Sequence, residues 1–220
     1  MKFTENEIRN AMLLYAITDR SWLKEGESLA GVCESVLKNG ATFLQIREKD
    51  LDGDTFEKEA GELKELCGKY HVPFVVNDSV EIAMDIGADG VHVGQSDIRG
   101  RDIRAMIGPD KILGISAGTV EEARAAENAG ADYIGVGAVF GTSTKKDARN
   151  LTIEKLQEIS GSVSIPVVAI GGINRGNVKE LKGSGVDGIA VISAIFAAED
   201  PGQAARELLE LSKETVYGNE

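Results

Sequence analysis

The chain has 220 residues, 42% of them hydrophobic, and a formal net charge of −12. This length can bury one sizeable core and falls near the usual size of a single α/β barrel, and no Pro-rich or Ser-rich stretch marks a linker. The acidic balance disfavours binding to nucleic acid or to an anionic membrane, because the summed charge would repel both. Charges more than about 8 Å apart are largely screened at physiological salt, so a local group of cations can still bind a phosphorylated ligand.

The N-terminal segment predicts a short helix and no export signal. Residues 3–10 carry several charged and polar side chains, and the apolar run at 11–17 is too short for a membrane span or a convincing signal peptide. Cys33 and Cys67 lie far apart without the CxxC spacing of zinc or redox sites, so they are interpreted as core thiols. We therefore expect a cytoplasmic protein with no membrane partner.

Eight short apolar runs with strand character follow one another along the chain. Amphipathic helical stretches separate most of them. The runs lie at residues 12–17, 42–47, 73–77, 89–93, 112–116, 132–137, 166–170 and 187–192. They are nearly continuous in apolar residues, which is typical of strands covered on both faces. Alternating β and α units predict a parallel sheet, and eight of them favour one (β/α)8 TIM barrel domain over residues 1–220. An open doubly wound sheet is the alternative.

A glycine signature leads into each even-numbered strand. The glycines are Gly40, Gly87, Gly130 and Gly185, and each stands between a helical stretch and an apolar run. Glycine ends helices at such positions because it adopts the left-handed backbone conformation that other residues resist. The repeat therefore supports the barrel.

Two aspartates stand at the predicted catalytic end of the barrel, which is formed by the carboxyl ends of the strands. Asp78 and Asp97 follow neighbouring strands and could share one hard cation. Mg²⁺ takes one or two protein carboxylates and completes its shell with water and substrate phosphate. Helix capping is the alternative, because both aspartates precede helical stretches.

Basic residues and glycines on the same rim indicate a phosphorylated ligand. Arg47, Lys49 and Lys145 offer a guanidinium fork and two ammonium groups that suit a diphosphate, with solvated surface charge as the alternative. Gly171-Gly172 and Ile192-Ser193 follow strands 7 and 8, where backbone N–H groups of barrels bind phosphate. A tight turn without a ligand is the alternative for the glycines.

The remaining polar and aromatic residues of interest have simpler interpretations. His92 lies within strand 4 and is expected to be an interior side chain satisfied by a neighbour, whereas His71 is expected at the surface. Tyr15 and Trp22 are interpreted chiefly as packing residues. No Ser/His/Asp or Cys/His arrangement is visible, which disfavours acyl transfer and nucleophilic hydrolysis. The polar loop at 141–150 is the predicted lid.

In their order along the chain, these motifs resemble the thiamin phosphate synthase family, and the resemblance covers essentially the whole chain. They are Tyr15-Ala16-Ile17-Thr18-Asp19, Gln45-Ile46-Arg47-Glu48-Lys49, Asn77-Asp78, His92-Val93-Gly94-Gln95-Ser96-Asp97, Thr142-Ser143-Thr144-Lys145, Gly171-Gly172-Ile173 and Ile192-Ser193-Ala194-Ile195. The resemblance implies a transferase that joins an aminopyrimidine methyl diphosphate to hydroxyethylthiazole phosphate. It also implies that diphosphate is released and that Mg²⁺ is the cofactor.

The resemblance implies a role for each matching residue. The implied pyrimidine diphosphate site comprises Gln45, Ile46, Arg47, Glu48, Lys49, Asn77, Ser116 and Lys145. Within it, the expected catalytic residues are Arg47, Lys49, Ser116 and Lys145. The implied thiazole phosphate site comprises Thr142, Ser143, Thr144, Gly172, Ile192 and Ser193. The implied metal ligands are Asp78 and Asp97.

Two other functions compete with the synthase. A thiazole tautomerase of the same barrel family is associated with a His in the strand 5 loop, where this chain has Gly118, and it would not need Asp78, Asp97 and Lys145 together. A non-catalytic sensor of phosphorylated ligands would need only the anion site after strands 7 and 8. In each case the expected partners are small phosphorylated heterocycles. The sequence is compatible with a homo-oligomer.

Overall fold

Eight parallel strands close into one barrel in the order of the chain. The computed structural model describes residues 3–48, 51–141 and 151–218. The strands are β1 Leu14–Ile17, β2 Phe43–Ile46, β3 Phe74–Asn77, β4 Gly90–Val93, β5 Ile112–Ala117, β6 Tyr133–Gly137, β7 Val167–Ile170 and β8 Gly188–Val191. Each one overlaps its predicted run, and β1 pairs with β8 to complete the cylinder. The predicted (β/α)8 barrel is therefore confirmed, and the open doubly wound sheet is wrong.

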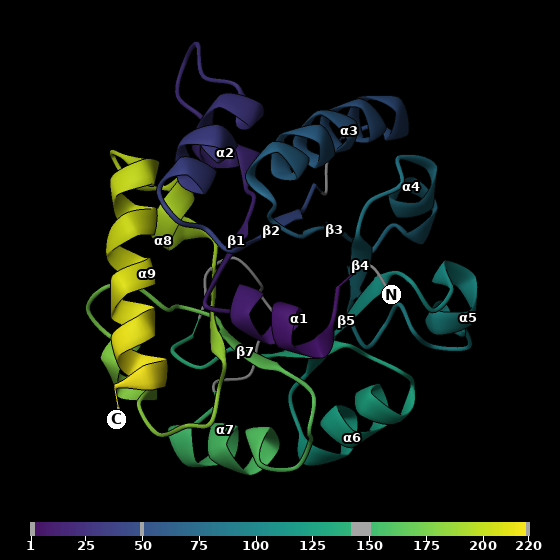
Figure 1. Ribbon diagram of the computed structural model, residues 1–220, viewed down its shortest axis with the longest axis vertical. Helices are drawn as coiled ribbons and strands as arrows, with labels where there is room; N and C mark the ends of the chain where they lie inside the picture. The colour runs from purple at the N-terminus through teal and green to yellow at the C-terminus, as the bar shows by residue number, and fades with distance from the viewer. Residues whose placement is uncertain (1–2, 49–50, 142–150, 219–220) are drawn as a thin grey trace.

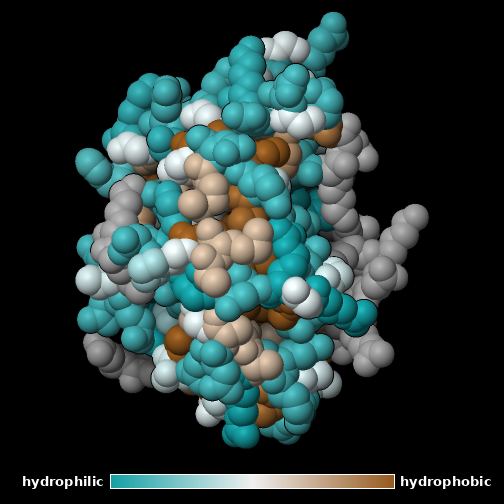
Figure 2. Space-filling model, turned by 90° about the vertical axis from the view of Figure 1, so that its right-hand side faces the viewer, coloured by the Kyte–Doolittle hydropathy of each residue, from teal (hydrophilic) through white to brown (hydrophobic). Residues whose placement is uncertain are grey.

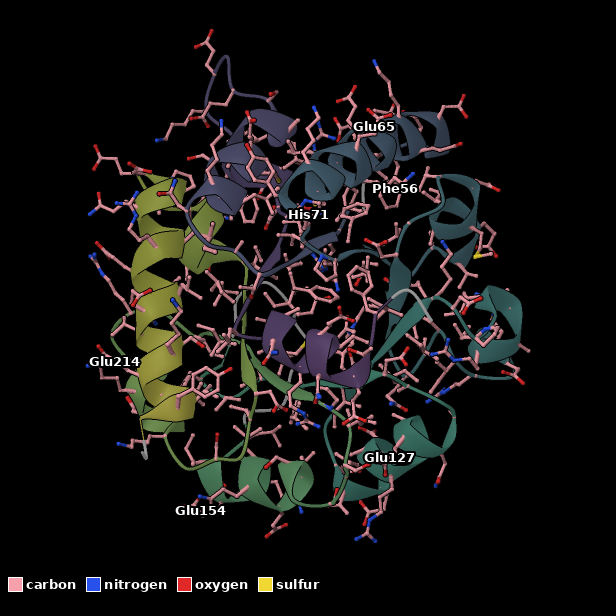
Figure 3. All side chains as sticks on the ribbon, in the orientation of Figure 1. Phe56, Glu65, His71, Glu127, Glu154 and Glu214 are labelled. Carbon is pink, nitrogen blue, oxygen red and sulfur yellow. The ribbon has the colours of Figure 1, made fainter. Side chains whose placement is uncertain are left out.

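Helices form a ring around the barrel (Figure 1). They are α2 Leu29–Lys38, α3 Gly53–Tyr70, α4 Val80–Asp85, α5 Ile103–Ile107, α6 Val120–Asn128, α7 Ile153–Ser160, α8 Ser193–Phe196 and α9 Pro201–Tyr217, with 3-10 turns η1 Arg20–Trp22 and η2 Val178–Leu181. Their outer faces carry charged side chains such as Glu65, Glu154 and Glu214 (Figure 3). In the part of the chain that the structure describes, no helix is long and apolar enough to cross a membrane.

The N-terminal helix α1, Glu5–Ala11, covers one end of the barrel, and Figure 1 shows it crossing that end in front of the strands. Thr4 begins it with a capping box, in which its side chain accepts from the Glu7 backbone and the Glu7 side chain accepts from the Thr4 backbone. Ile8 and Ala11 are buried with the side chains of the barrel interior. A short helix thus lies at Glu5–Ala11, where one was expected near residues 3–10, and it leaves the opposite rim for the site.

Successive strand residues point to opposite faces of the sheet, so the strands contribute to two layers of side chains. These two layers stabilise the barrel. The inner layer contains Tyr15, Phe43 and Tyr133, all nearly inaccessible to solvent. The outer layer lies between the strands and the helices and includes the free thiols of Cys33 and Cys67, as expected for core cysteines. Burial of this apolar surface on both faces of every strand is the main force that stabilises the fold.

The glycines that lead into the even-numbered strands have the predicted left-handed backbone. Their φ angles are 113° at Gly40, 64° at Gly87, 81° at Gly130 and 78° at Gly185. A residue with a Cβ would be strained at each of these positions. The glycine signature in the sequence therefore marks the turns that return the chain to the start of the next strand.

One side of the helical ring is partly apolar. Figure 2 shows the face on the right of Figure 1, where α4 and α5 lie, with apolar residues along its middle between hydrophilic ones. Met84 of α4 and Met106 of α5 are 41% and 44% exposed. This side is distinct from the rim at the carboxyl ends of the strands.

Candidate active site

Two aspartates meet at the carboxyl ends of β3 and β4. Asp78 directly follows β3, and Asp97 follows β4 after a short loop. The Asp97 carboxyl is within hydrogen-bonding reach of the Asp78 carboxyl. Burial raises the pKa of Asp78, and the charge of Asp97 raises it further. Carboxylate oxygens held against each other in this way suit a hard divalent cation, which would offset their repulsion.

Helix capping does not explain these aspartates. The N-cap of α4 is Ser79, whose side chain accepts from the Ile82 N–H, and the N-cap of α5 is Asp102. Asp97 instead accepts from the Gly94 N–H at 2.9 Å within its own loop. The capping alternative is therefore wrong. In the described residues no group of three or more His, Cys, Asp or Glu side chains could hold a metal, so water and substrate oxygens would complete the shell of an ion.

The backbone around Asp78 has an uncommon conformation. Its φ angle is 63°, in the left-handed region that few residues other than glycine adopt. The Asp78 N–H donates to the carbonyl of His92 on β4 at 2.8 Å, and the next N–H, of Ser79, donates back to Asn77 at 2.7 Å. Strain of this kind persists only where the surroundings impose it, and it often marks functional sites.

Arg47 lies near the aspartate pair. Its backbone N–H donates to the Thr18 hydroxyl at 3.0 Å, which ties the end of β2 to the end of β1. Its positive charge lowers the pKa of Asp78, as does a hydrogen bond from Asn77. The structure thus brings Arg47, Asn77, Asp78 and Asp97 together on one rim, as expected from the sequence.

Gln45 and Ile46 point to opposite sides of β2. Gln45 is 2% exposed and faces the barrel interior, where its amide nitrogen donates to the Tyr15 hydroxyl. Ile46 is buried in the outer layer beneath the helices. Any contact between Ile46 and a ligand would therefore involve its main chain alone.

The Glu48 carboxyl is buried near the helices. Its side chain is 3% exposed, and its nearer oxygen lies 3.9 Å from the Arg20 guanidinium. The other oxygen has no hydrogen-bond partner among the described residues. Burial raises the pKa of Glu48 to about 7, which the charge of Arg20 only partly offsets.

Ser116 belongs to a partly buried polar cluster. Its hydroxyl lies 3.0 Å from Nε2 of His92, and its carbonyl accepts from the Gln95 side chain at 2.7 Å. Nδ1 of His92 lies 2.9 Å from the Tyr133 hydroxyl. The prediction that His92 is an interior residue satisfied by neighbours is confirmed.

The sequence interpretation missed Tyr133, whose hydroxyl lies 2.9 Å from Nδ1 of His92. Tyr15 packs against Phe43 with ring centroids 4.4 Å apart, so the expected packing role is confirmed. The signal that could have found Tyr133 is the series of glycines on β5 and β6, which leaves room for large polar side chains inside the barrel.

The loops after β6 and β7 approach each other closely at the glycine pair. Gly171 and Gly172 have φ angles of 101° and 69°. A Cβ on Gly172 would lie 2.1 Å from the carbonyl oxygen of Gly141, so packing between the two loops already requires glycine there. After β8, Ser193 is exposed and begins α8 without a side-chain cap. The phosphate role of Gly172, Ile192 and Ser193 stays a prediction.

Several predicted site residues lie outside the described part of the chain. They are Lys49, Thr142, Ser143, Thr144 and Lys145, together with most of the predicted lid. The cationic contribution expected from the two lysines therefore stays a prediction.

The position of these groups defines the class of protein. Catalysis in parallel α/β barrels takes place at the carboxyl ends of the strands, where this chain gathers its carboxylates, its arginine and its glycine loops. It is a (β/α)8 barrel enzyme with a site suited to phosphorylated small molecules. Residues 14–195 match the model of the family described as thiamine monophosphate synthase, and the chain belongs to this family.

Individual relatives agree with this assignment. The chain is similar to the thiamine-phosphate synthase of Clostridium tetani, with 48% identity over 195 residues that cover 89% of this chain and 93% of the relative. The thiamine-phosphate synthase of Clostridium beijerinckii is 49% identical with the same coverage. Thiamine phosphate pyrophosphorylase from Pyrococcus furiosus has a TM-score of 0.86 at 41% identity and covers 95% of this chain and 99% of its own. The family expected from the sequence motifs is thereby confirmed.

Proposed function

We propose that this chain joins 4-amino-2-methyl-5-(diphosphooxymethyl)pyrimidine to hydroxyethylthiazole phosphate, which yields thiamin monophosphate and diphosphate. The enzyme is then a transferase of a pyrimidinylmethyl group. The observation that carries the proposal is the rim that groups Arg47, Asn77, Asp78 and Asp97 in a chain of this family. A diphosphate leaving group needs both a cation site and a guanidinium, and this rim offers residues for each.

Mg²⁺ is the proposed cofactor, and Asp78 and Asp97 are its proposed ligands. The raised pKa of Asp78 beside Asp97 supports the proposal, because a carboxylate pair of this kind is stabilised by a shared cation. The donor set consists of oxygen atoms, which Mg²⁺ prefers. Bound Mg²⁺ would stabilise the charge that grows on the oxygens of the departing diphosphate.

The pyrimidine diphosphate is proposed to bind along the ends of β2, β3 and β5. Arg47 would contact its phosphate oxygens as a two-pronged donor, with Lys49 and Lys145 as further cations. Gln45, Asn77 and Ser116 would orient the pyrimidine and the diphosphate through hydrogen bonds. Ile46 and Glu48 complete the proposed set through the backbone of the same segment.

The thiazole phosphate is proposed to bind at the loops after β6, β7 and β8. The backbone at Gly172 and at Ile192-Ser193 would hold its phosphate, and Thr142, Ser143 and Thr144 are proposed as further binding residues. This arrangement would set the thiazole nitrogen beside the pyrimidine methylene, and the step would need no catalytic base.

The residues of the site would act by positioning and by electrostatics. The bond between the pyrimidine methylene and the diphosphate oxygen breaks, and its electron pair leaves with the oxygen. The lone pair of the thiazole nitrogen then forms the new bond to the methylene carbon. Fixed cations stabilise the charge on the leaving group, and a closed site keeps out water that would trap the methylene cation.

Diphosphate release from both substrates, followed with and without Mg²⁺, tests the proposed function. Release that requires both substrates and the metal supports the synthase. Isomerisation of the thiazole alone would select the tautomerase, and binding of phosphorylated heterocycles without turnover would select the sensor. Gly118 in the strand 5 loop favours the synthase over the tautomerase, which is associated with a His there.

Two further expectations accompany the proposed function. We expect the enzyme in the cytoplasm, because its two free, buried cysteines are typical of proteins from reducing compartments. A homo-oligomer remains a prediction that sedimentation of the purified chain would test.

A further inference from the structure

A continuous series of hydrogen bonds crosses the barrel interior from β2 to β5. The Gln45 amide nitrogen donates to the Tyr15 hydroxyl, which lies 2.8 Å from the Tyr133 hydroxyl. The Tyr133 hydroxyl lies 2.9 Å from Nδ1 of His92, and Nε2 of His92 lies 3.0 Å from the Ser116 hydroxyl. These five residues are called the interior relay. Both of its ends, Gln45 and Ser116, belong to the proposed pyrimidine diphosphate site.

The barrel is shaped to hold the relay. Tyr15 and Tyr133 are 1% and 0% exposed, with ring centroids 5.8 Å apart in an edge contact. Gly114 stands in register between His92 and Tyr133 on the neighbouring strands. A Cβ on Gly114 would lie 2.3 Å from the Tyr133 hydroxyl and 2.5 Å from Nδ1 of His92. The space left by this glycine is therefore the space in which the two side chains meet.

The direction of the relay follows from its proton count. A phenol hydroxyl has one proton to donate. Because Tyr15 accepts from the Gln45 amide, we assign its own proton to the bond with Tyr133, where either hydroxyl could donate, and the proton of Tyr133 to Nδ1 of His92. His92 then carries its proton on Nε2 and donates to Ser116. Burial raises the pKa of Tyr15 and Tyr133, so both remain protonated donors.

The two ends of the relay consequently have opposite polarity. The Gln45 amide uses its nitrogen inside the barrel, which leaves its oxygen as the acceptor for a ligand. Ser116 accepts from His92, which leaves its hydroxyl proton for a ligand. If the relay ran the other way, Gln45 would present a donor and Ser116 an acceptor. The polarities of the two ends are linked, because no hydroxyl between them can donate in both directions.

We propose that Tyr15, Tyr133 and His92 are positioning residues that set Gln45 as an acceptor and Ser116 as a donor toward the substrate. The inference rests on the proposed function and deepens it. A ligand with an amino group near β2 and an oxygen or ring-nitrogen acceptor near β5 matches this polarity, as an aminopyrimidine diphosphate does. An analogue with an oxo group in place of the amino group would face the Gln45 oxygen with a second acceptor, and the site would reject it.

Nitrogen-15 NMR of the histidines in the full-length, ligand-free protein tests the direction without any need for activity. The chain has two histidines, and His71 provides a reference because it is exposed and ends α3 at the far end of the barrel. We expect His92 in the Nε2–H tautomer at neutral pH, and we expect this preference to weaken in Tyr133→Phe. A wild-type His92 with its proton on Nδ1, or on both nitrogens, would overturn the proposal. This measurement decides the matter even if the variant does not fold.

Kinetics of Tyr133→Phe test the positioning role. We expect kcat/KM for the pyrimidine diphosphate to fall about tenfold or more, while the KM for thiazole phosphate stays unchanged. Preference for the amino substrate over its oxo analogue should fall as well. In a Ser116→Ala background, Tyr133→Phe should have little further effect, because the relay then has no hydroxyl to direct. Fully additive losses would refute the role.

Tyr70→Phe is the matched control, because its hydroxyl donates to Glu34 at 2.9 Å on the outer helices. It should leave both substrate preferences unchanged. Failure of the proposed synthase activity can be distinguished from failure of the proposed relay. A protein with the Nε2–H tautomer that releases no diphosphate would disprove the proposed synthase activity and support the relay.

Discussion

The carboxyls of Asp78 and Asp97 face each other between the ends of β3 and β4. The Asp78 backbone is held by the His92 carbonyl, and the Asp97 side chain by the Gly94 N–H. Burial and mutual repulsion raise the pKa of Asp78, which costs stability unless a cation is present. The fold therefore tolerates repulsion between two carboxylates. Such repulsion is expected where two carboxylates are placed close enough to bind one cation.

Replacement of Asp78 should separate function from stability. In Asp78→Asn we expect Mg²⁺-dependent diphosphate release to fall by about 100-fold or more, because one of the two proposed charged ligands is lost. The thermal unfolding midpoint without metal should stay equal or rise, because the repulsion with Asp97 disappears. Steady-state rates and thermal melts of the same preparation measure both.

Asp102→Ala is the control, because it should lower stability and leave activity unchanged. Asp102 caps α5 by accepting from the Ala105 N–H at 3.0 Å, and loss of such a cap costs about 0.5 to 2 kcal/mol. Its catalytic rate should remain close to that of the wild type. A rate for Asp78→Asn near that of the wild type would show that Asp78 is not a ligand of the catalytic metal.

Arg47→Lys tests whether the shape of the guanidinium matters beyond its charge. Lysine keeps the positive charge but loses the two-pronged donor geometry, so we expect kcat/KM for the pyrimidine diphosphate to fall about tenfold or more, and Arg47→Ala to remove most turnover. The fold should persist, because the structural hydrogen bond of Arg47 uses its backbone N–H. Arg101→Ala, which removes an exposed pair with Glu81, should change neither rate nor stability appreciably. Equal rates for Arg47→Lys and the wild type would mean that only the positive charge at this position matters for catalysis.

The buried Glu48 carboxyl predicts a dependence of stability on pH. Its pKa of about 7 in the folded protein exceeds the ordinary value of 4.5, so the folded protein binds this proton more tightly than the unfolded chain does. The resulting stability is fully present below the ordinary pKa and is lost as pH rises through about 7. Above that pH we expect Glu48→Gln to unfold with a free energy about 1 to 3 kcal/mol higher than the wild type.

Denaturant unfolding at several pH values checks this expectation. The exposed Glu65→Gln variant, on the outer face of α3, should follow the wild-type curve. A Glu48→Gln curve parallel to that of the wild type from acid to alkaline pH would mean that Glu48 titrates normally.

The sequence allowed the barrel and the rim to be predicted because both depend on local patterns. Apolar runs and left-handed glycines locate the strands, and the residues just after each strand must share one end of a parallel barrel. The direction of each side chain was not predictable, because strands covered on both faces show no alternation of polarity. The family resemblance grouped Ile46 and Glu48 with Arg47, although Ile46 and the Glu48 carboxyl are buried at the helices.

The interior relay illustrates a second limit of the sequence. Tyr15 and Tyr133 are separated by 118 positions and contact each other only because the barrel closes. Neither a motif nor a spacing connects them. Their partner His92 was expected to have a neighbour. Which residue that is depends on which side chains of three different strands point into the barrel.

Gly114→Ala tests whether the space at this position is as restricted as the structure indicates. The new methyl group would lie 2.2 Å from the Tyr133 ring and 2.5 Å from the His92 ring, both inside a packed barrel that cannot shift cheaply. We expect destabilisation of about 1 to 3 kcal/mol, the usual cost of overpacking a core, together with a loss of pyrimidine diphosphate affinity. Gly118→Ala is the control, because its methyl group would meet Glu122 at an ordinary distance of 3.5 Å. Denaturant unfolding and substrate titration of the two variants measure the difference, and equal stability would mean that the His92 and Tyr133 side chains are not held together over Gly114.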